Sequence, residues 1–289
     1  MIEPGIVRVD KPEGPTSHDV VAAARRAFGE RRIGHTGTLD PFATGLLLVC
    51  VGRSATRLAP LLNDLPKRYR AVARLGEETT TDDRTGDVTL RNDVDTLDSS
   101  RVAAALEAMV GPSLQTPPAY SAKKVEGRRA YRSARAGVEL DLAPVPIIIH
   151  ELRVLDVRLP EVEFDVECSS GTYIRAIARD LGRTLGVGGH LRALRRTGIG
   201  AHSVNGAVSM DRLVDEDAVR AAWLSPLQAV AHLPTVRVGE DDMTRIMHGM
   251  SVAAPDDADS GQVAIASGDR LVAIGHIDGG SIQPRKVFA

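Results

Sequence analysis

The sequence lacks the features that would place the chain in a membrane or outside the cell. It has two cysteines in 289 residues, and neither Cys50 nor Cys168 has a partner at metal-ligand spacing. This argues against a disulfide framework and a cysteine metal site, and we expect buried free thiols in a reducing cytosol. The longest apolar runs, such as residues 46–51, are too short to cross a bilayer, and the N-terminus carries acids and prolines where a signal peptide is apolar. A cytoplasmic protein without membrane contact is predicted.

The chain also lacks a strong net charge, which is −2, but its charges are unevenly distributed. Residues 120–135 contain six basic residues and one acid, and residues 171–200 contain six arginines and one acid. A basic zone on a nearly neutral chain is typical of a protein that binds a polyanion at one face. The alternative is that these clusters are ordinary solvated faces.

Hydrophobic periodicity predicts strands and helices in irregular alternation. Expected strands lie at residues 6–9, 46–51, 69–75, 147–157 and 164–168, and expected helices at 18–28, 102–110 and 172–185. Ser17 is the expected N-cap of the first helix. In the helix at 172–185, apolar residues share one face, and Arg175, Arg179 and Arg183 share another. We therefore predict a mixed α/β (α+β) sheet domain rather than a doubly wound one.

Several segments fall outside this pattern. Residues 34–41 are expected to form a loop, residues 82–98 an exposed acidic excursion, and residues 115–142 a basic insertion. Towards the C-terminus, strands at 263–266 and 271–277 are predicted to form a hairpin in a small β module. The predicted domains are residues 1–230 and 231–289.

The segment 34–45 is the first candidate for chemistry. Its glycines, threonines and proline predict a tight loop, and such loops often display reactive groups. It contains one acid, Asp40, and one imidazole, His35. Pro41 biases the backbone of Asp40 to an extended conformation and so limits where its carboxylate points. The alternative is that Asp40 is only a turn former before a proline.

Long segments of the chain resemble one family, the bacterial tRNA pseudouridine-55 synthases of the TruB type. The matching stretches are DKPEGPTS (10–17), GHTGTLDPFATGLL (34–47), KRYRAVARLG (67–76), QTPPAYSAKKVEGRRAYRSAR (115–135) and SSGTYIRAIARDLG (169–182), extended by GGHLRALRR (188–196). Together they span residues 5–200 in the family's order. The resemblance implies the pseudouridine synthase fold, with a central mixed or antiparallel sheet flanked by helices and a small C-terminal PUA-like module.

The resemblance also implies an activity. Such enzymes convert one uridine in the T-loop of tRNA, at position 55, to its C-glycoside isomer, with no cofactor, no metal and no protein partner, acting as monomers. The base is flipped out of the RNA into a pocket. Asp40 corresponds to the catalytic nucleophile, which attacks either C6 of uracil or C1′ of ribose; the sequence leaves both open.

Further roles follow from the same resemblance. Arg175 corresponds to the cation that keeps the nucleophile ionised. Tyr69 corresponds to the ring that packs on the base and is a candidate for helping to remove the C5 proton, and Tyr173 to a second pocket tyrosine. In a chain with nine aromatic residues these positions are informative, although either tyrosine could equally be a core aromatic.

Other residues are expected to bind substrate. Leu194 corresponds to an apolar residue that lines the pocket. His35 corresponds to a histidine that fills the space left by flipped nucleotides, so we expect its loss to weaken RNA binding more than chemistry. Lys11, with Pro12, is expected to shape the turn beside the active-site loop. Phosphate contacts are expected from the basic insertion, through Lys123, Lys124, Arg128, Arg129 and Arg132.

Three alternatives compete with this interpretation. A guide-RNA-dependent rRNA pseudouridine synthase shares the motifs but has extra flanking segments and a fuller RNA module. An RNA chaperone of the same fold would not need an intact Asp40, Tyr69 and Arg175. A glycosidase would need a second carboxylate, and the matched loops offer none besides Asp40. The C-terminal module is short and acidic, and its alternative role is to cap the catalytic domain.

Overall fold

The structure, a computed structural model, describes residues 3–120, 124–125, 128–129 and 142–288. The chain forms two compact units. Unit 1 comprises Met1–Asp40, Leu46–Asn63 and Ser203–Ala289, and unit 2 comprises Pro41–Gly45 and Asp64–His202. None of the helices in the described ranges has the length and apolar character needed to span a bilayer.

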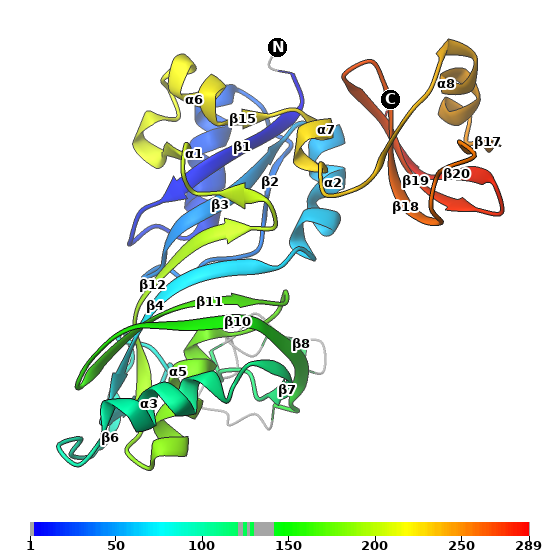
Figure 1. Ribbon diagram of the computed structural model, residues 1–289. Helices are drawn as coiled ribbons and strands as arrows, with labels where there is room; N and C mark the ends of the chain where they lie inside the picture. Colours follow the sequence, from blue (N-terminus) through cyan, green and yellow to red (C-terminus); the bar gives the residue numbers. More distant parts are fainter. Residues whose placement is uncertain (1–2, 121–123, 126–127, 130–141, 289) are drawn as a thin grey trace. The chain divides into compact units, whose positions relative to one another are not determined.

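Unit 1 opens with a small sheet covered by a helix (Figure 1). Its strands are β1 (Gly5–Lys11), β2 (Ile33–Thr36), β3 (Thr44–Val51, whose first two residues belong to unit 2), β14 (Val208–Ser209) and β15 (Trp223–Leu224). Helix α1 (Ser17–Phe28) buries Val20, Val21 and Ala24 against the apolar residues of β1, β2 and β3. Burial of this apolar stripe stabilises the helix more than its intrinsic propensity does.

Two local predictions in this region are wrong. The N-cap of α1 is Thr16, whose side chain forms a capping box with Asp19, and Ser17 is the first helical residue. The segment predicted as a loop at 34–41 begins as a strand, because β2 pairs antiparallel with β3 from Ile33↔Val51 to Thr36↔Leu48. The capping box is a local contact, whereas for β2 a tertiary partner, strand β3, decided the conformation.

The remainder of unit 1 contains short helices and a C-terminal sheet. The helical segments are α2 (Arg53–Asn63), η1 (Met210–Arg212), α6 (Glu216–Ala222), α7 (Pro226–Ala229) and α8 (Glu240–Met247). The sheet follows the order β16 (Thr235–Arg237), β18 (Gly261–Ser267), β19 (Arg270–Asp278), β20 (Ser281–Val287) and β17 (Val252–Ala253). The predicted hairpin is confirmed by the antiparallel pairing of β18 with β19, which a turn at Gly268 joins.

Unit 2 is built on an antiparallel sheet. Its order is β12 (Gly189–Ile199), β4 (Lys67–Leu75), β11 (Glu161–Cys168), β10 (Val145–Arg158) and β7 (Gly111–Gln115). Helices α5 (Ile174–Leu185) and α3 (Ser99–Glu107) contact each other as well as β12 and β10 respectively (Figure 1). Shorter strands are β5 (Glu77–Thr79), β6 (Val88–Arg91), β8 (Lys124–Val125), β9 (Arg128–Arg129) and β13 (His202–Ser203, at the boundary with unit 1).

Alternation along β4 and β11 divides this sheet into two faces. Tyr69, Ala71 and Ala73 on β4 are buried, whereas Arg68 and Arg70 are exposed. The predicted mixed α/β class and β-rich C-terminal region are confirmed. The predicted burial of both cysteines is confirmed as well, and burial raises the pKa of Cys50 to about 12 and that of Cys168 to about 11.

Candidate active site

Asp40 lies in unit 1, directly after a residue that is anchored by two hydrogen bonds. The backbone N–H of Leu39 donates to Ser17 Oγ at 2.9 Å, and Ser17 Oγ donates to the carbonyl of Leu39 at 3.2 Å. Ser17 and Leu39 are both buried, whereas Asp40 is half-buried. Because buried hydrogen bonds are costly to leave unmade, this pair fixes the backbone next to the carboxylate.

Two further predicted site residues belong to unit 1: His35, which is part of the segment 34–45, and Lys11, at the end of β1. Lys11 is fully buried, and its Nζ donates to the carbonyls of Pro12 at 2.8 Å and Pro15 at 2.7 Å. These contacts stabilise the turn that follows β1. His35 is half-buried, and its ring meets the exposed ring of His18 edge-to-face, with centroids 5.5 Å apart. The ring contact limits the orientations available to His35.

In unit 2, Tyr69 and Leu194 occupy neighbouring strands on the same face of the sheet. Tyr69 on β4 is opposite Arg196 on β12, and Leu194 is opposite Ala71, two residues further along β4. Tyr69 and Leu194 are both buried. The register therefore brings together the two residues that were expected to line the pocket for the base.

The same face holds two buried cations that the sequence analysis did not identify. Lys67 is 5% exposed and Arg196 is 1% exposed. Burial lowers the pKa of Lys67 to about 8, and the positive charge of Arg196 contributes to the lowering. Lys67 Nζ donates to the carbonyl of Leu65 at 2.6 Å. This strand face thus combines an aromatic ring with buried positive charge.

The start of helix α5 is fixed by a side chain from the end of β7. The Gln115 amide accepts from the backbone N–H of Tyr173 at 2.9 Å and donates to the carbonyl of Tyr173 at 3.1 Å. Tyr173 is the N-cap of α5, and Gln115 is buried. These reciprocal bonds hold the helix end that carries Tyr173 and Arg175.

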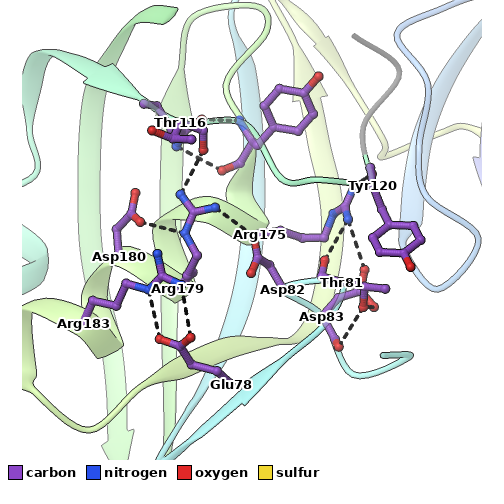
Figure 2. A network of polar contacts seen from close by, with 12 residues as sticks. Glu78, Thr81, Asp82, Asp83, Thr116, Tyr120, Arg175, Arg179, Asp180 and Arg183 are labelled. Atoms are coloured by element: carbon purple, nitrogen blue, oxygen red, sulfur yellow. Dashed lines mark hydrogen bonds and ion pairs between the residues drawn. The ribbon is translucent and has the colours of Figure 1, made fainter. Parts of the chain in front are cut away.

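Arg175 is buried and makes contacts with three groups (Figure 2). Its guanidinium donates to the carbonyls of Thr81 and Tyr120, each at 2.9 Å, and lies 3.5 Å from a carboxylate oxygen of Asp83. Asp83 also accepts from the hydroxyl of Thr81 at 2.8 Å and from the backbone N–H of Thr85 at 2.9 Å. A buried guanidinium needs this set of partners, because removal of one partner of a buried ion pair costs about 3–5 kcal/mol.

Arg179 and Arg183 continue the network along the same helix (Figure 2). Arg179 donates at 2.9 Å to each of three oxygens, belonging to Asp82, Asp180 and the carbonyl of Thr116. Arg183 forms a two-pronged ion pair with Glu78, and the hydrogen bonds from Arg183 lower the pKa of Glu78. The arginines of α5 therefore bind the helix to β5 and to the turn that follows it.

This network corrects one prediction. Residues 82–98 were expected to be an exposed excursion, but Asp83 is buried, and Asp82 is half-buried and paired with Arg179. The alternative that the arginines of residues 171–200 lie on a solvated face is also wrong for Arg175 and Arg179, because these residues are 5% and 6% exposed. The two adjacent acids, Asp82 and Asp83, could have been predicted as partners of these arginines, since a buried arginine requires an acidic partner.

The basic insertion gives little information of this kind. Lys123 and Arg132 lie outside the described residues, and Lys124, Arg128 and Arg129 belong to the short strands β8 and β9, which pair antiparallel. Their expected phosphate contacts stay a prediction. Among the residues that the structure does describe, no group of three or more His, Cys, Asp or Glu side chains could hold a metal ion.

The predicted site residues thus fall into two sets. Lys11, His35 and Asp40 belong to unit 1, and Tyr69, Tyr173, Arg175 and Leu194 belong to unit 2. Within unit 2 the strand register brings Tyr69 and Leu194 together, and Tyr173 and Arg175 lie two residues apart at the start of α5. The pairing of Asp40 with Arg175 stays a prediction.

The chain matches two family models and many known proteins. The model described as "TruB family pseudouridylate synthase (N terminal domain)" matches residues 25–174, and that described as "tRNA pseudouridylate synthase B C-terminal domain" matches residues 175–230. Two curated relatives, both named tRNA pseudouridine synthase B, come from Thermobifida fusca (45% identical, covering 99% of this chain and 98% of that protein) and Paenarthrobacter aurescens (42% identical, covering 99% and 95%).

A solved structure shares the fold as well. It is described as "Structure of H/ACA RNP bound to a substrate RNA containing 2'-deoxyuridine", and the matched chain is 26% identical with a TM-score of 0.75. The match covers 99% of this chain and 85% of that one. The sheets and helices described above therefore form a fold that is also found in an RNA-bound particle.

Proposed function

The chain belongs to the TruB family of pseudouridylate synthases, and we propose that it converts uridine 55 in the T-loop of tRNA to pseudouridine with Asp40 as the nucleophile. The observation that carries the proposal is the intact loop motif, in which the residue before Asp40 is held by Ser17. The relative from Thermobifida fusca, named tRNA pseudouridine synthase B, is 45% identical to this chain, whereas the protein from the H/ACA particle is 26% identical. This favours a tRNA substrate over a guide-dependent rRNA substrate.

In the proposed reaction, the Asp40 carboxylate attacks C6 of uracil or C1′ of ribose. The bond between N1 and C1′ breaks, the base turns while it is held, and a bond forms between C5 and C1′. The bond between Asp40 and the substrate carbon then breaks, the proton on C5 leaves and N1 gains one, so the carboxylate is regenerated and the product is an isomer of the substrate. No cofactor, metal ion or protein partner is needed for this balance, and the proposed enzyme acts as a cytoplasmic monomer.

The remaining roles are assigned by chemistry and position. Arg175 keeps Asp40 ionised, which a nucleophilic carboxylate requires. Tyr69 stacks on the flipped uracil, Tyr173 and Leu194 complete the pocket, and support for this comes from the shared strand face of Tyr69 and Leu194. His35 fills the space in the RNA loop, and Lys11 supports the turn after β1.

The proposed domains are a catalytic domain at residues 1–230 and a PUA-like RNA-binding module at 231–289. The insertion between β7 and β10 supplies phosphate contacts through its lysines and arginines, which should make tRNA binding strongly dependent on salt. Within unit 1 the module contacts α2, where Lys286 Nζ donates to the carbonyl of Arg57 at 2.8 Å and the Arg57 guanidinium lies over the Phe288 ring.

The test uses an unmodified tRNA transcript that carries tritium at uridine C5. We expect the wild type to release tritium and Asp40→Asn to release at least about a thousandfold less, because the amide is not a nucleophile. Asp269→Asn, in the exposed turn between β18 and β19, is a matched control that should keep wild-type activity. A transcript with cytidine at position 55 should give no release.

Each alternative predicts another result. A guide-dependent enzyme would release tritium only after a guide RNA is added. A glycosidase would release free uracil. A pure chaperone would accelerate tRNA folding without tritium release, and equally well in Asp40→Asn. Any of these outcomes contradicts the proposal.

A further inference from the structure

The turn that follows β5 has an unusual backbone. Asp82 has a φ of 57°, and it is the one residue other than glycine with positive φ in the described ranges. L-residues disfavour this left-handed conformation, which persists where surrounding contacts determine it. Here the carbonyl of Asp82 accepts from the N–H of Leu191 at 3.0 Å, and its carboxylate accepts from Arg179 at 2.9 Å.

This turn presents two groups to Arg175. The carbonyl of Thr81, directly before Asp82, accepts from the Arg175 guanidinium at 2.9 Å. The carboxylate of Asp83, directly after Asp82, lies 3.5 Å from the same guanidinium. The dihedral angles of Asp82 therefore determine how both partners face Arg175.

Arg179 connects this turn with a second segment that also faces Arg175. It lies one helical turn after Arg175 on α5 and donates to Asp82 and to the carbonyl of Thr116, both at 2.9 Å. Four residues after Thr116, the carbonyl of Tyr120 accepts from Arg175 at 2.9 Å. Arg179 thus holds the two segments that supply the carbonyl partners of Arg175 (Figure 2).

The charge of Asp82 depends on this contact. Burial raises the pKa of the Asp82 carboxyl, and Arg179 is the main opposing influence. Arg179 is 6% exposed and the Asp82 side chain is 16% exposed, so water cannot fully replace either residue as the other's hydrogen-bond partner. The charge of Arg179 therefore favours the ionised form of the Asp82 carboxyl.

We propose that Asp82 and Arg179 form a positioning pair, which holds the left-handed turn and the Thr116 segment against α5 and thereby orients the guanidinium of Arg175 for the reaction. The inference rests on the proposed function, in which Arg175 acts on the nucleophile. Neither residue touches substrate; both act through Arg175. The pair is distinct from the direct contact of Arg175 with Asp83.

The test compares four variants with one matched control. Arg179→Gln removes the charge, and Arg179→Lys keeps the charge towards Asp82. Asp82→Gly removes the carboxylate but tolerates the left-handed backbone, whereas Asp82→Ala removes the carboxylate and strains the turn. The control is Arg183→Gln, which breaks the ion pair of another arginine, with Glu78, one turn further along the same helix.

Tritium release in single-turnover and steady-state experiments is measured together with the melting temperature. Arg179→Gln and Asp82→Ala are expected to lower kcat by about tenfold to a hundredfold with KM near wild type, because small misplacements of a catalytic group have effects of this size. Asp82→Gly should lie between Asp82→Ala and wild type. Arg179→Lys keeps the charge but not the three hydrogen bonds of the guanidinium, so its kcat should lie between those of Arg179→Gln and wild type, and Arg183→Gln should match wild type. The double variant Asp82→Gly/Arg179→Gln should be no slower than Arg179→Gln alone.

The proposal is overturned if the folded variants keep wild-type kcat, if their loss lies entirely in KM, or if Arg183→Gln loses as much kcat as Arg179→Gln. Should Arg179→Gln not fold, Asp82→Ala and Asp82→Gly decide the question, since both leave Arg179 in place. If the wild type and Arg183→Gln release no tritium, the proposed function itself has failed and the inference falls with it. If they do release tritium and the Asp82 and Arg179 variants match them, only the inference has failed.

Discussion

The two units hold polar groups in their interiors in different ways. In the described part of the chain, unit 1 buries few such residues, namely Lys11, Ser17 and Thr36, whereas unit 2 buries Lys67, Thr79, Asp83, Gln115, Arg175, Arg179, His190 and Arg196. In unit 1 the hydrogen bonds of Lys11, and those of Ser17 that anchor the residue before the candidate nucleophile, are made with backbone groups. In unit 2 the candidate cation is held by a carboxylate as well as by carbonyls.

This difference suits what each unit contributes to the proposed reaction. Hydrogen bonds to the backbone fix the position of a nucleophile and leave its carboxylate oxygens available for the cation and the substrate. A buried arginine needs acids and carbonyls, because its charge is costly without them. Substitutions in unit 2 should therefore alter charge and stability together, whereas those in unit 1 should alter geometry.

The largest loss of activity that tests this contrast is expected from Arg175→Lys. If a positive charge were sufficient at this position of unit 2, lysine would replace arginine without loss of activity. A lysine ammonium cannot contact the carbonyls of Thr81 and Tyr120 and the carboxylate of Asp83 in the geometry of a guanidinium. We expect kcat for tritium release to fall by about a hundredfold with KM little changed. Arg183→Lys is the control, and a wild-type kcat in Arg175→Lys would show that orientation of the cation is unimportant.

A second prediction concerns the cost of buried charge in unit 2. Burial lowers the pKa of Lys67 from 10.5 to about 8, so between these values the unfolded chain binds more protons than the folded protein. Lys67 should therefore contribute stability that rises with pH across this window. Lys67→Met lacks the titrating group, and we expect the wild type to gain on the order of 2–3 kcal/mol more than this variant between about pH 7 and pH 10.

Urea unfolding at both pH values measures this difference, because the other titrating groups are common to the two proteins and cancel. Parallel pH profiles for the wild type and Lys67→Met would mean that the Lys67 ammonium is not desolvated in the folded state. The contrast between the units would then rest on the arginines alone.

The same contrast explains which features could be predicted from the sequence. Apolar periodicity was sufficient for β3, β4 and the C-terminal hairpin, because each buries a regular face. The family motifs indicated Asp40, Tyr69 and Arg175. Periodicity carries no information about which acid a buried arginine selects, so Asp82 and Asp83 were assigned to an exposed segment. Their burial depends on contacts with α5, about ninety residues later in the chain.

The helix start in unit 1 carried a local signal that was not used. Thr16 and Ser17 are both good N-cap residues, but only Thr16 has an acid three residues later, Asp19, which completes a capping box. The structure gives the cap to Thr16, and Ser17 bonds to Leu39 instead. This second contact is long-range, with the neighbour of Asp40, and the local sequence carries no signal for it.

The smallest expected effect tests whether the hydrogen bonds between Ser17 and Leu39 position Asp40. Ser17→Ala leaves the buried N–H and carbonyl of Leu39 without the hydroxyl, which should lower the free energy of unfolding by about 1–3 kcal/mol. Thr16→Ala is the matched control, because it removes the N-cap of the same helix at a cost of about 1 kcal/mol without contacting Leu39. The two variants should therefore have similar melting temperatures.

Their activities should differ. Because Ser17 anchors the backbone next to Asp40, Ser17→Ala is expected to lower kcat severalfold to about tenfold, whereas Thr16→Ala should keep wild-type kcat. Equal activities in two equally destabilised variants would mean that the Ser17–Leu39 bonds only stabilise the fold. A loss confined to Ser17→Ala would mean that unit 1 positions its carboxylate with two neutral hydrogen bonds, whereas unit 2 uses ion pairs to position Arg175.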